Sequence, residues 1–275
     1  EFEVLNNIFG YREFRKGQQE VIDKILSGKD VFCILPTGGG KSLCYEIPAY
    51  IFKGTTLVIS PLISLMKDQV DNLNSLGINA AYISGGNDFE EVKNIIRKFI
   101  KGEFKLLYVS PERLENRYFL DNIEKANIAQ IVVDEAHCVS MWGHDFRKSY
   151  SKIKPFICNL KKRPIITAFT ATATEIVMKD SIELLGLYNP FIYKGSFSRD
   201  NLEINVLKEV DKLEIISEII SEHEEESGII YCSTKNEVEE LYKHMLYRGK
   251  SVGKYHGSLK DKEKNYYQEE FLNDN

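Results

Sequence analysis

Short apolar runs alternate with longer amphipathic stretches along much of the chain. The runs are rich in Val, Ile and Leu, as strands buried on both faces of a sheet are, and they occupy residues 31–35, 56–60, 80–84, 105–109, 130–133 and 165–169. The stretches between them have helical spacing. In residues 64–76, for example, Met66, Val70 and Leu73 fall on one side of the predicted helix. This alternation predicts an α/β fold in which a parallel sheet is covered by helices on both faces.

Polar residues predict where two of the later helices begin. Asn87 with Glu90, and Thr172 with Glu175, have the three-residue separation of a capping box. Residues 188–199, by contrast, contain Pro, Gly and Ser and lack helical periodicity. We expect them to form a connector.

A second, smaller alternating unit follows the connector. We expect strands over residues 202–206, 228–232 and 251–255, and helices from about Lys212, over residues 236–248, and in the charged stretch that reaches the C-terminus. Three strands are fewer than the five or six of an ordinary sheet. The pattern therefore predicts a first domain over residues 1–198 and an incomplete second domain over residues 199–275.

A glycine-rich segment, residues 36–42, lies between the first predicted strand and the next helix. Glycines let backbone N–H groups turn toward phosphate oxygens, and the N-terminus of a helix adds partial positive charge. Lysine and serine at the end of the segment suit the outer phosphates and Mg²⁺. A plain glycine turn before a surface lysine is the alternative, but it leaves the agreement of strand, loop and helix unexplained. We predict a nucleotide site made by Thr37, Gly38, Gly39, Gly40, Lys41 and Ser42.

Two carboxylates end the predicted strand over residues 130–133. Residues at the carboxyl end of a parallel strand lie beside a bound nucleotide in folds of this type. Asp134 is therefore expected to hold Mg²⁺ together with Ser42, and Glu135 to orient and deprotonate the attacking water. An acidic strand end facing solvent is the ordinary alternative, and the phosphate-binding loop upstream makes it the lesser one.

These motifs together resemble those of a known family. Lys41 with the Asp-Glu-Ala-His sequence of residues 134–137 resembles a DEAH-box superfamily 2 helicase. Residues 9–18, Phe-Gly-Tyr-Arg-Glu-Phe-Arg-Lys-Gly-Gln, are similar to the segment that precedes the phosphate-binding loop in RecQ helicases. Residues 138–147, Cys-Val-Ser-Met-Trp-Gly-His-Asp-Phe-Arg, are similar to the aromatic-rich loop of that family. Further helicase motifs are matched, in order, by residues 60–70, 109–114, 170–172, 228–233 and 255–257.

The resemblance implies an ATP-dependent DNA helicase built from a RecA-like P-loop NTPase lobe and part of a second RecA-like lobe. It implies that Gln18 reads the adenine edge and that Tyr11 and Arg15 stack on the base or sugar. Catalytic roles are implied for Lys41, Asp134, Glu135 and His137. DNA binding or its coupling to hydrolysis is implied for Ser60, Pro61, Ser110, Pro111, Trp142, His144, Phe146, Arg147, Thr170 and Thr172.

Several of these residues also have a purely structural interpretation. Trp142 and Phe146 would fill a hydrophobic seam between lobes, and Thr172 would act as a helix N-cap worth about 1 kcal/mol. Gln18 would occupy a solvated position on an amphipathic helix. The two Ser-Pro pairs, at residues 60–61 and 110–111, would simply end strands.

Charge, cysteine spacing and hydropathy limit the possible partners, metal sites and cellular location of the protein. A formal net charge of −5 gives no general attraction to nucleic acid, so binding depends on a local basic strip. The five cysteines include no C-x-x-C pair, which argues against a zinc module and a disulfide framework. No apolar run approaches the roughly 20 residues of a membrane span, and the first residues do not resemble a signal peptide. We expect a cytoplasmic protein, associated with the nucleoid in a bacterium or nuclear in a eukaryote.

The chain also departs from the family pattern. RecQ proteins continue into a glycine-rich motif, an arginine finger, a four-cysteine zinc module and a winged helix, none of which is recognisable here. An arginine finger is worth roughly 10³- to 10⁵-fold in rate, so we expect this stretch to bind ATP and Mg²⁺ but to hydrolyse ATP slowly, with no zinc site. The expected partners are single-stranded DNA and duplex junctions, with movement 3′ to 5′ by resemblance. An exposed edge of the second lobe leaves room for self-association.

Three other functions remain open at this point. An RNA helicase of the DEAH or DEAD kind shares most of the motifs, but the Trp-Gly-His-Asp-Phe-Arg sequence of residues 142–147 argues against it. A non-catalytic module that binds nucleic acid under the control of ATP is the second. A small-molecule P-loop kinase is the third, and it leaves the Asp-Glu-Ala-His segment and the aromatic-rich loop unexplained.

Overall fold

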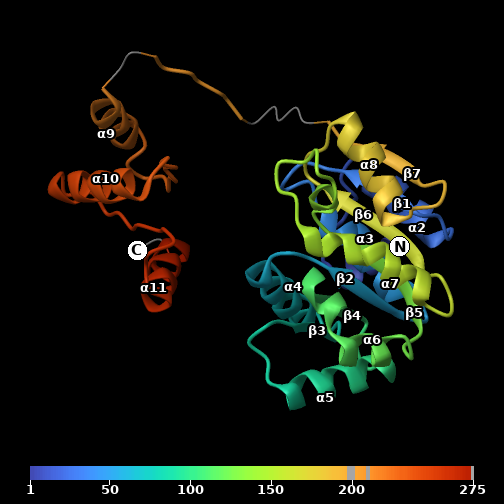
Figure 1. Cartoon of the computed structure of the whole chain (residues 1–275). Coiled ribbons are helices and arrows are strands. Elements are labelled where there is room, and N and C mark those ends of the chain that lie inside the picture. The colour runs from blue at the N-terminus through green and yellow to red at the C-terminus, as the bar shows by residue number, and fades with distance from the viewer. Residues whose placement is uncertain (197–201, 209–210, 274–275) are drawn as a thin grey trace. The chain divides into compact units, whose positions relative to one another are not determined.

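Seven parallel strands form one sheet, in the order β3-β4-β2-β5-β6-β1-β7. The computed structural model describes residues 1–196, 202–208 and 211–273, and it divides into two compact units, Glu1–Arg199 and Asp200–Asn275, of which the first contains the sheet (Figure 1). The strands are β1 (Val31–Ile34), β2 (Thr55–Ile59), β3 (Ala80–Ile83), β4 (Leu106–Val109), β5 (Ile128–Val133), β6 (Ile165–Thr170) and β7 (Phe191–Lys194). The predicted parallel α/β fold is confirmed, and six of these strands are the six apolar runs.

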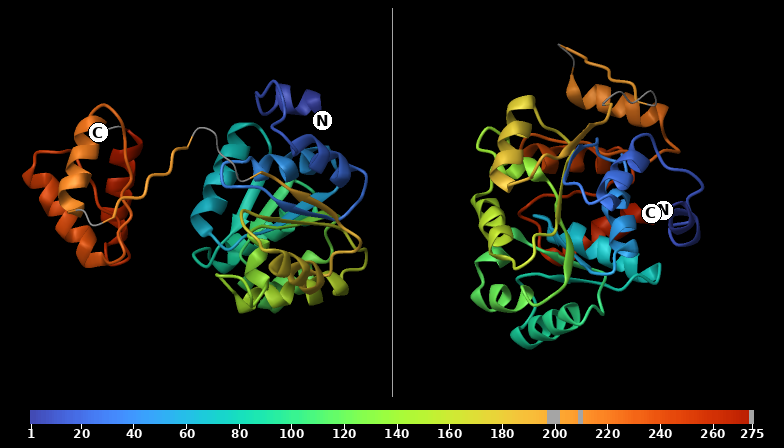
Figure 2. Two further views of the ribbon diagram at one scale, coloured as in Figure 1. Left: turned by 90° about the horizontal axis from the view of Figure 1, so that it is seen from above. Right: turned by 90° about the vertical axis from the view of Figure 1, so that its right-hand side faces the viewer.

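Helices cover both faces of this sheet, as Figure 2 shows. Residues alternate between the faces along each strand, so Val31 and Cys33 of β1 pack into one hydrophobic cluster and Phe32 and Ile34 into the other. The first cluster includes residues of α1 (Phe2–Asn7), α2 (Gln18–Leu26), α3 (Lys41–Ile51) and α4 (Ile63–Ser75). The second includes residues of α5 (Phe89–Ile100), α6 (Arg117–Ile123), α7 (Ile153–Asn159) and α8 (Glu175–Leu185). Nowhere in the described residues is a helix long and apolar enough to cross a membrane.

The seventh strand corrects the prediction of a connector over residues 188–199. β7 pairs in parallel with β1, with Val31 opposite Phe191. Phe191 and Tyr193 are partly buried against the first cluster, whereas Ile192 and Lys194 are exposed. An edge strand with one solvated face has no continuous apolar run, and for this reason the pattern of buried strands did not identify it. Residues 197–199 lie outside the described part of the chain.

Two helix caps lie slightly later than predicted. Asp88 caps α5 in a capping box, because the side chain of Asn87 is already engaged as acceptor of the Ser84 backbone N–H at 2.8 Å. Thr174 caps α8, whereas Thr172 was predicted as that cap. The N-cap interpretation of Thr172 is therefore wrong, and its backbone lies in the turn that follows β6.

The second unit contains three helices among its described residues. They are α9 (Lys212–Glu222), α10 (Lys235–Tyr247) and α11 (Asp261–Leu272), in agreement with the predicted helical stretches. The strands predicted over residues 202–206, 228–232 and 251–255 are not formed in the described part of this unit. These segments have no ladder partner there, and Tyr231 is 91% exposed. Because a strand is stabilised by pairing with a neighbour, apolar sequence alone did not decide their structure.

Candidate nucleotide site and aromatic loop

The predicted site residues follow four strands that are adjacent in the sheet. The phosphate-binding loop (residues 36–42) follows β1, Ser60 follows β2, Asp134 follows β5, and Thr170 ends β6. These strands lie in the order β2-β5-β6-β1. Because all of them are parallel, their carboxyl ends meet at one edge of the sheet, where ligands bind in folds of this type.

The phosphate-binding loop depends on its three glycines. Gly38 and Gly40 have φ angles of 75° and 77°, in the left-handed region that favours glycine. A Cβ on Gly39 would lie 2.8 Å from the carbonyl oxygen of Pro36. Gly40 is the N-cap of α3, and its lack of a side chain leaves the first N–H groups of that helix free of a side-chain cap. The loop thus presents a helix N-terminus of the kind that binds phosphate.

The segment before α2 braces this loop. Gln18 is only 2% exposed, and its Nε2 donates to the carbonyl oxygen of Gly40 at 3.1 Å. Its Oε1 accepts from the backbone N–H of Arg15 at 2.8 Å, and the Arg15 guanidinium donates to the carbonyl oxygen of Gly38. Gln18 is therefore not the solvated residue of the structural alternative. Its predicted contact with adenine requires the carboxamide to exchange partners and stays a prediction.

A cavity of about 380 Å³ brings the predicted nucleotide and magnesium residues together. Its lining includes residues from α2, the loop, α3 and the end of β5. The exposed ring of Tyr11 lies at its rim. Of the residues predicted from sequence, the lining contains Tyr11, Arg15, Gln18, Thr37, Gly38, Gly40, Lys41, Ser42, Ser60, Asp134 and Glu135.

Asp134 is a buried carboxylate with a fixed position. Ser60 Oγ donates to Asp134 Oδ2 at 3.0 Å, and the hydroxyl of Tyr150 donates to the backbone carbonyl of Asp134 at 2.8 Å. Burial raises the pKa of Asp134, the charge of Glu135 raises it further, and the Ser60 hydrogen bond and the charge of Lys41 partly offset this. A cation would relieve the unfavourable burial of this charge. The oxygen donors of Asp134 and Ser42, which line the same cavity, are of the type that Mg²⁺ prefers, so the residues present fit that ion.

Glu135 and His137 connect this cavity to β6. Glu135 has φ 47° and ψ 47°, a left-handed conformation that is uncommon for a residue with a side chain. Its Oε2 lies 3.3 Å from His137 Nδ1, which is also 2.8 Å from Thr170 Oγ1. The Thr170 hydroxyl donates to the Thr172 carbonyl at 3.0 Å, so it accepts from His137. Nδ1 therefore carries the proton of a neutral imidazole, whose pKa is lowered mainly by burial.

The aromatic loop, residues 140–147, exposes its largest ring. Trp142 is 76% exposed, and Phe146 is exposed as well. The guanidinium of Arg147 bonds to Asp145 and also reaches the carbonyl oxygen of Pro61 at 3.4 Å. The loop is thus tied to the segment after β2 while its aromatic side chains face outward.

A ring contact ties the same loop to the carboxylates. His144 stacks on His137, with ring centroids 4.8 Å apart and an angle of 16° between the planes. His137 in turn contacts Glu135. A displacement of the loop therefore bears on the side chain expected to orient water. The other Ser-Pro pair is less directly placed: Ser110 precedes a 3-10 helix, η1 (Pro111–Glu115), in which Pro111 is buried.

The phosphate-binding loop, the two carboxylates and the aromatic loop fall within the residues matched by one family model. The model described as DEAD/DEAH box helicase matches residues 15–180. The chain belongs to the DEAD/DEAH box helicase family. A second model, described as helicase conserved C-terminal domain, matches residues 211–275 of this family member.

Among the curated relatives of this DEAD/DEAH box family member is the ATP-dependent DNA helicase RecQ of Bacillus subtilis. The two are 43% identical over 272 residues, which cover 98% of this chain and 46% of the relative. The predicted similarity to RecQ helicases is confirmed. The chain spans about half the length of that relative.

Solved structures of other helicases share the fold. Helicase Lhr of Mycobacterium smegmatis, bound to single-stranded DNA and AMP-PNP, matches with a TM-score of 0.66 at 18% identity, over 95% of this chain and 38% of that one. Dbp5 of Saccharomyces cerevisiae, bound to RNA and ADP BeF3, matches with a TM-score of 0.72 at 17% identity, over 98% and 71%. The RecA-like fold is thus shared by proteins in complex with either nucleic acid, and it does not by itself identify the partner.

Sequence reasoning missed three side chains around the family's site. Tyr150 supports Asp134, Glu46 is buried in α3, and Tyr108 of β4 is buried and lines the cavity. Burial raises the pKa of Glu46 to about 8, which the nearby Tyr108 hydroxyl only partly offsets. Glu46 Oε1 has no hydrogen-bond partner among the described residues. The available signal was one carboxyl group in the otherwise apolar stretch of residues 43–49.

Proposed function

We propose that this chain is the motor part of a RecQ-type, ATP-dependent DNA helicase. ATP hydrolysis would drive movement along single-stranded DNA, 3′ to 5′, and duplex unwinding in repair or recombination. One observation carries the proposal: a single cavity holds the phosphate-binding loop and both carboxylates, and the segment that leaves it leads directly into an exposed aromatic loop. We assign the two RecA-like lobes to residues 1–198 and 199–275.

The residues of the cavity divide the work of hydrolysis between them. Lys41 and the N–H groups at the start of α3 bind the phosphates, and Ser42 and Asp134 would hold Mg²⁺. Magnesium held there would supply positive charge that offsets the negative charge of the phosphate groups. Glu135 orients the attacking water and takes its proton. The neutral His137 donates a hydrogen bond from Nδ1 to Thr170, and the same nitrogen lies 3.3 Å from Glu135 Oε2.

Binding of single-stranded DNA is assigned to the aromatic loop. Exposed Trp142 and Phe146 offer faces on which bases stack irrespective of sequence, which is worth about 1–3 kcal/mol per base. Two contacts transmit a movement of the loop: Arg147 to the carbonyl of Pro61, and His144 to the ring of His137. Coupling between DNA and hydrolysis would use these contacts.

The finer assignments follow from the same proposal. We propose that the whole protein acts on duplex junctions and that it lies in the cytoplasm, at the nucleoid or in the nucleus. We also propose that it self-associates through the second lobe. The observation behind the last is the exposed apolar side chains of that unit, among them Ile204, Ile229 and Tyr231.

ATP hydrolysis by the 275-residue chain tests the proposal. The rate is measured without nucleic acid, with single-stranded DNA and with single-stranded RNA of the same base sequence, for the wild type, for Lys41→Ala and for Lys53→Ala. Lys53 is an exposed lysine outside the cavity and serves as the matched control. Because slow turnover is expected, the ratio of the rates with and without DNA decides.

We expect DNA to stimulate hydrolysis in the wild type and in Lys53→Ala, and Lys41→Ala to hydrolyse no ATP. Equal stimulation by RNA would favour an RNA helicase. ATP binding without hydrolysis under any condition would favour an ATP-gated binding module. Either result would contradict the proposal.

A further inference from the structure

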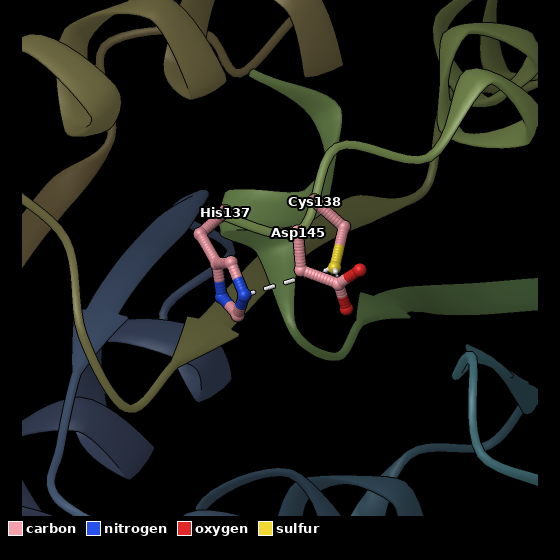
Figure 3. A group of neighbouring side chains, drawn as sticks. All are labelled: His137, Cys138 and Asp145. Atoms are coloured by element: carbon pink, nitrogen blue, oxygen red, sulfur yellow. Dashed lines mark hydrogen bonds between the residues drawn. The ribbon is translucent and has the colours of Figure 1, made fainter. Parts of the chain in front are cut away.

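Three side chains of different chemistry meet where the aromatic loop returns to the Asp-Glu-Ala-His segment. The ligand atoms of His137, Cys138 and Asp145 all lie within 4.8 Å of one another. Cys138 Sγ is 3.7 Å from His137 Nε2 and 3.7 Å from Asp145 Oδ2. Figure 3 shows the imidazole ring facing the other two side chains.

The two separations that involve Cys138 Sγ are close to the ligand spacing of a tetrahedral metal site. Zinc binds sulfur at about 2.3 Å and nitrogen or oxygen at about 2.0 Å, so two ligand atoms on one ion lie roughly 3.5 Å apart. Both contacts of Cys138 Sγ differ from that value by a few tenths of an ångström. The remaining pair, His137 and Asp145, lies within 4.8 Å, so binding one ion would require these side chains to rotate toward each other.

We propose that His137, Cys138 and Asp145 bind a thiophilic divalent cation such as Zn²⁺, with water in the fourth position. The site is distinct from the magnesium position at Ser42 and Asp134, because a thiolate and an imidazole suit a softer ion than oxygen ligands do. The scattered cysteines argue against a four-cysteine module, but one cysteine joined by a histidine and a carboxylate needs no second cysteine.

The surroundings of the three ligands prepare them for a metal. His137 Nδ1 donates to Thr170, so Nε2 is left with a lone pair directed toward Cys138. A histidine ligand is usually oriented in this way by a partner on its other nitrogen. Cys138 is anchored by its carbonyl, which accepts from the backbone N–H of Arg147 at 2.9 Å. Asp145 is exposed, which gives an ion a path from solvent.

Charge and proton balance favour a divalent ion here. Metal binding breaks the S–H bond of Cys138, forms a sulfur–metal bond and releases one proton to solvent. The resulting thiolate and the carboxylate of Asp145 together balance the two positive charges. Arg147 is the cation that now contacts Asp145, and it keeps a second partner in the carbonyl of Pro61 if the metal displaces it.

A bound ion would join the aromatic loop to the segment that carries Glu135. Asp145 lies inside the loop, three residues from Trp142, and His137 contacts Glu135. We therefore expect the metal to restrict the loop and to lower DNA-stimulated hydrolysis. This consequence rests on the proposed function, whereas metal binding itself does not.

Cobalt absorption tests the site directly. Co²⁺ is titrated into the chain carrying Cys158→Ser and Cys232→Ser, since these two cysteines are the ones that are not buried. A sulfur-to-cobalt charge-transfer band with strong visible bands is expected, and Zn²⁺ should abolish both. Adding Cys138→Ser should remove the charge-transfer band, and adding Asp145→Asn should weaken binding at least tenfold. Asp180→Asn is the matched control, because Asp180 contacts the same loop through Ser140 but lies outside the cluster.

Absence of the bands in the parent, or their persistence with Cys138→Ser, overturns the site. Exposed Asp145 keeps the test valid if Cys138→Ser misfolds, because undiminished binding by Asp145→Asn overturns it as well. Saturating Zn²⁺ should then lower DNA-stimulated hydrolysis in the parent but not in the variant that also carries Asp145→Asn. An equal effect in both proteins would show that the metal does not act by restricting the aromatic loop. A parent that shows the bands but no DNA stimulation contradicts the proposed function and leaves the metal site supported.

Discussion

His137 Nδ1 lies 2.8 Å from Thr170 Oγ1, and this contact joins the segment that follows β5 to the end of the adjacent strand β6. Both side chains are buried. The same histidine contacts Glu135 on one side and stacks with His144 of the aromatic loop on another. One ring therefore touches the residue expected to orient water, the strand that follows the loop in sequence, and the loop expected to bind DNA.

Replacing Thr170 by valine tests the role of that contact. Thr170→Val keeps the shape of the side chain but removes the acceptor of a buried imidazole N–H, which costs roughly 1–3 kcal/mol of stability. We expect DNA stimulation of hydrolysis to fall while ATP binding is kept. Thr174→Ala is the control, since loss of the α8 cap costs about 1 kcal/mol without touching His137. If both variants lose the same amount of DNA stimulation, the loss in Thr170→Val is explained by lower stability and not by the missing contact with His137.

The hydrogen bond from Ser60 to Asp134 is expected to support magnesium binding. Ser60→Ala removes a donor that holds the Asp134 carboxylate in position. Loss of such a supporting contact typically costs about 10- to 100-fold in metal affinity. The measurement is the Mg²⁺ dependence of ATP binding. Ser84, which follows β3, lies outside the cavity lining, so Ser84→Ala should leave the Mg²⁺ dependence unchanged. An unaltered Mg²⁺ dependence in Ser60→Ala would show that Ser60 is not needed for the metal.

Buried Glu46 is expected to make stability depend on pH. Its pKa rises from the ordinary value of 4.5 to about 8 in the folded chain, so between these values the folded state binds more protons than the unfolded state. The free energy of unfolding therefore falls as pH rises through this window and levels off above about pH 8. The loss amounts to a few kcal/mol, since one pKa unit corresponds to about 1.4 kcal/mol.

Urea unfolding measures this dependence at about pH 5, 6.5 and 8, which span the window between the two pKa values. Glu46→Gln keeps the shape of the side chain but cannot ionise, so its stability should fall less over the series. Glu90→Gln, at an exposed position on α5, should follow the wild type. A wild type and Glu46→Gln with parallel pH profiles would refute the assignment.

Trp142 is expected to carry much of the DNA contact. Trp142→Ala should leave ATP binding intact and weaken both DNA binding and DNA stimulation, with a loss of about 1–3 kcal/mol for one stacked base. Met141→Ala is a close control, because Met141 is the adjacent residue and, like Trp142, is 76% exposed. If both variants bind DNA alike, simple apolar exposure and not base stacking accounts for the contact.

The sequence predicted the strands β1 to β6 because each of them is largely buried and therefore forms a nearly continuous apolar run. β7 was missed because one face of it is solvated. The strands predicted around Ile204 and Tyr231 were wrong for the opposite reason: their apolar residues have no ladder partner in the described part of the second unit. Strand formation depends on neighbours that local sequence does not reveal.

More of the site than of the fold could be predicted, because most of its functional residues lie close together in the sequence. Consecutive residues form the phosphate-binding loop, and the carboxylates follow one strand. The contacts of Tyr150 with Asp134, and of His137 with Thr170, join residues 16 and 33 positions apart. Contacts of this kind depend on the packing of strands and helices. Ser60 was expected to bind DNA, but it is buried and donates a hydrogen bond to Asp134. This contact also depends on the packing of strands, which the sequence does not reveal.

Fluorescence of Trp142 gives the most direct test of a nucleotide site coupled to a DNA-binding loop, because it is the only tryptophan in the sequence. Single-stranded DNA is titrated into the wild type and Lys41→Ala, each with and without ATP and Mg²⁺. We predict that DNA quenches the emission in both proteins, and that ATP with Mg²⁺ shifts the DNA concentration at half-quenching only in the wild type. Emission unchanged by DNA, or the same nucleotide-dependent shift in Lys41→Ala, would contradict the account.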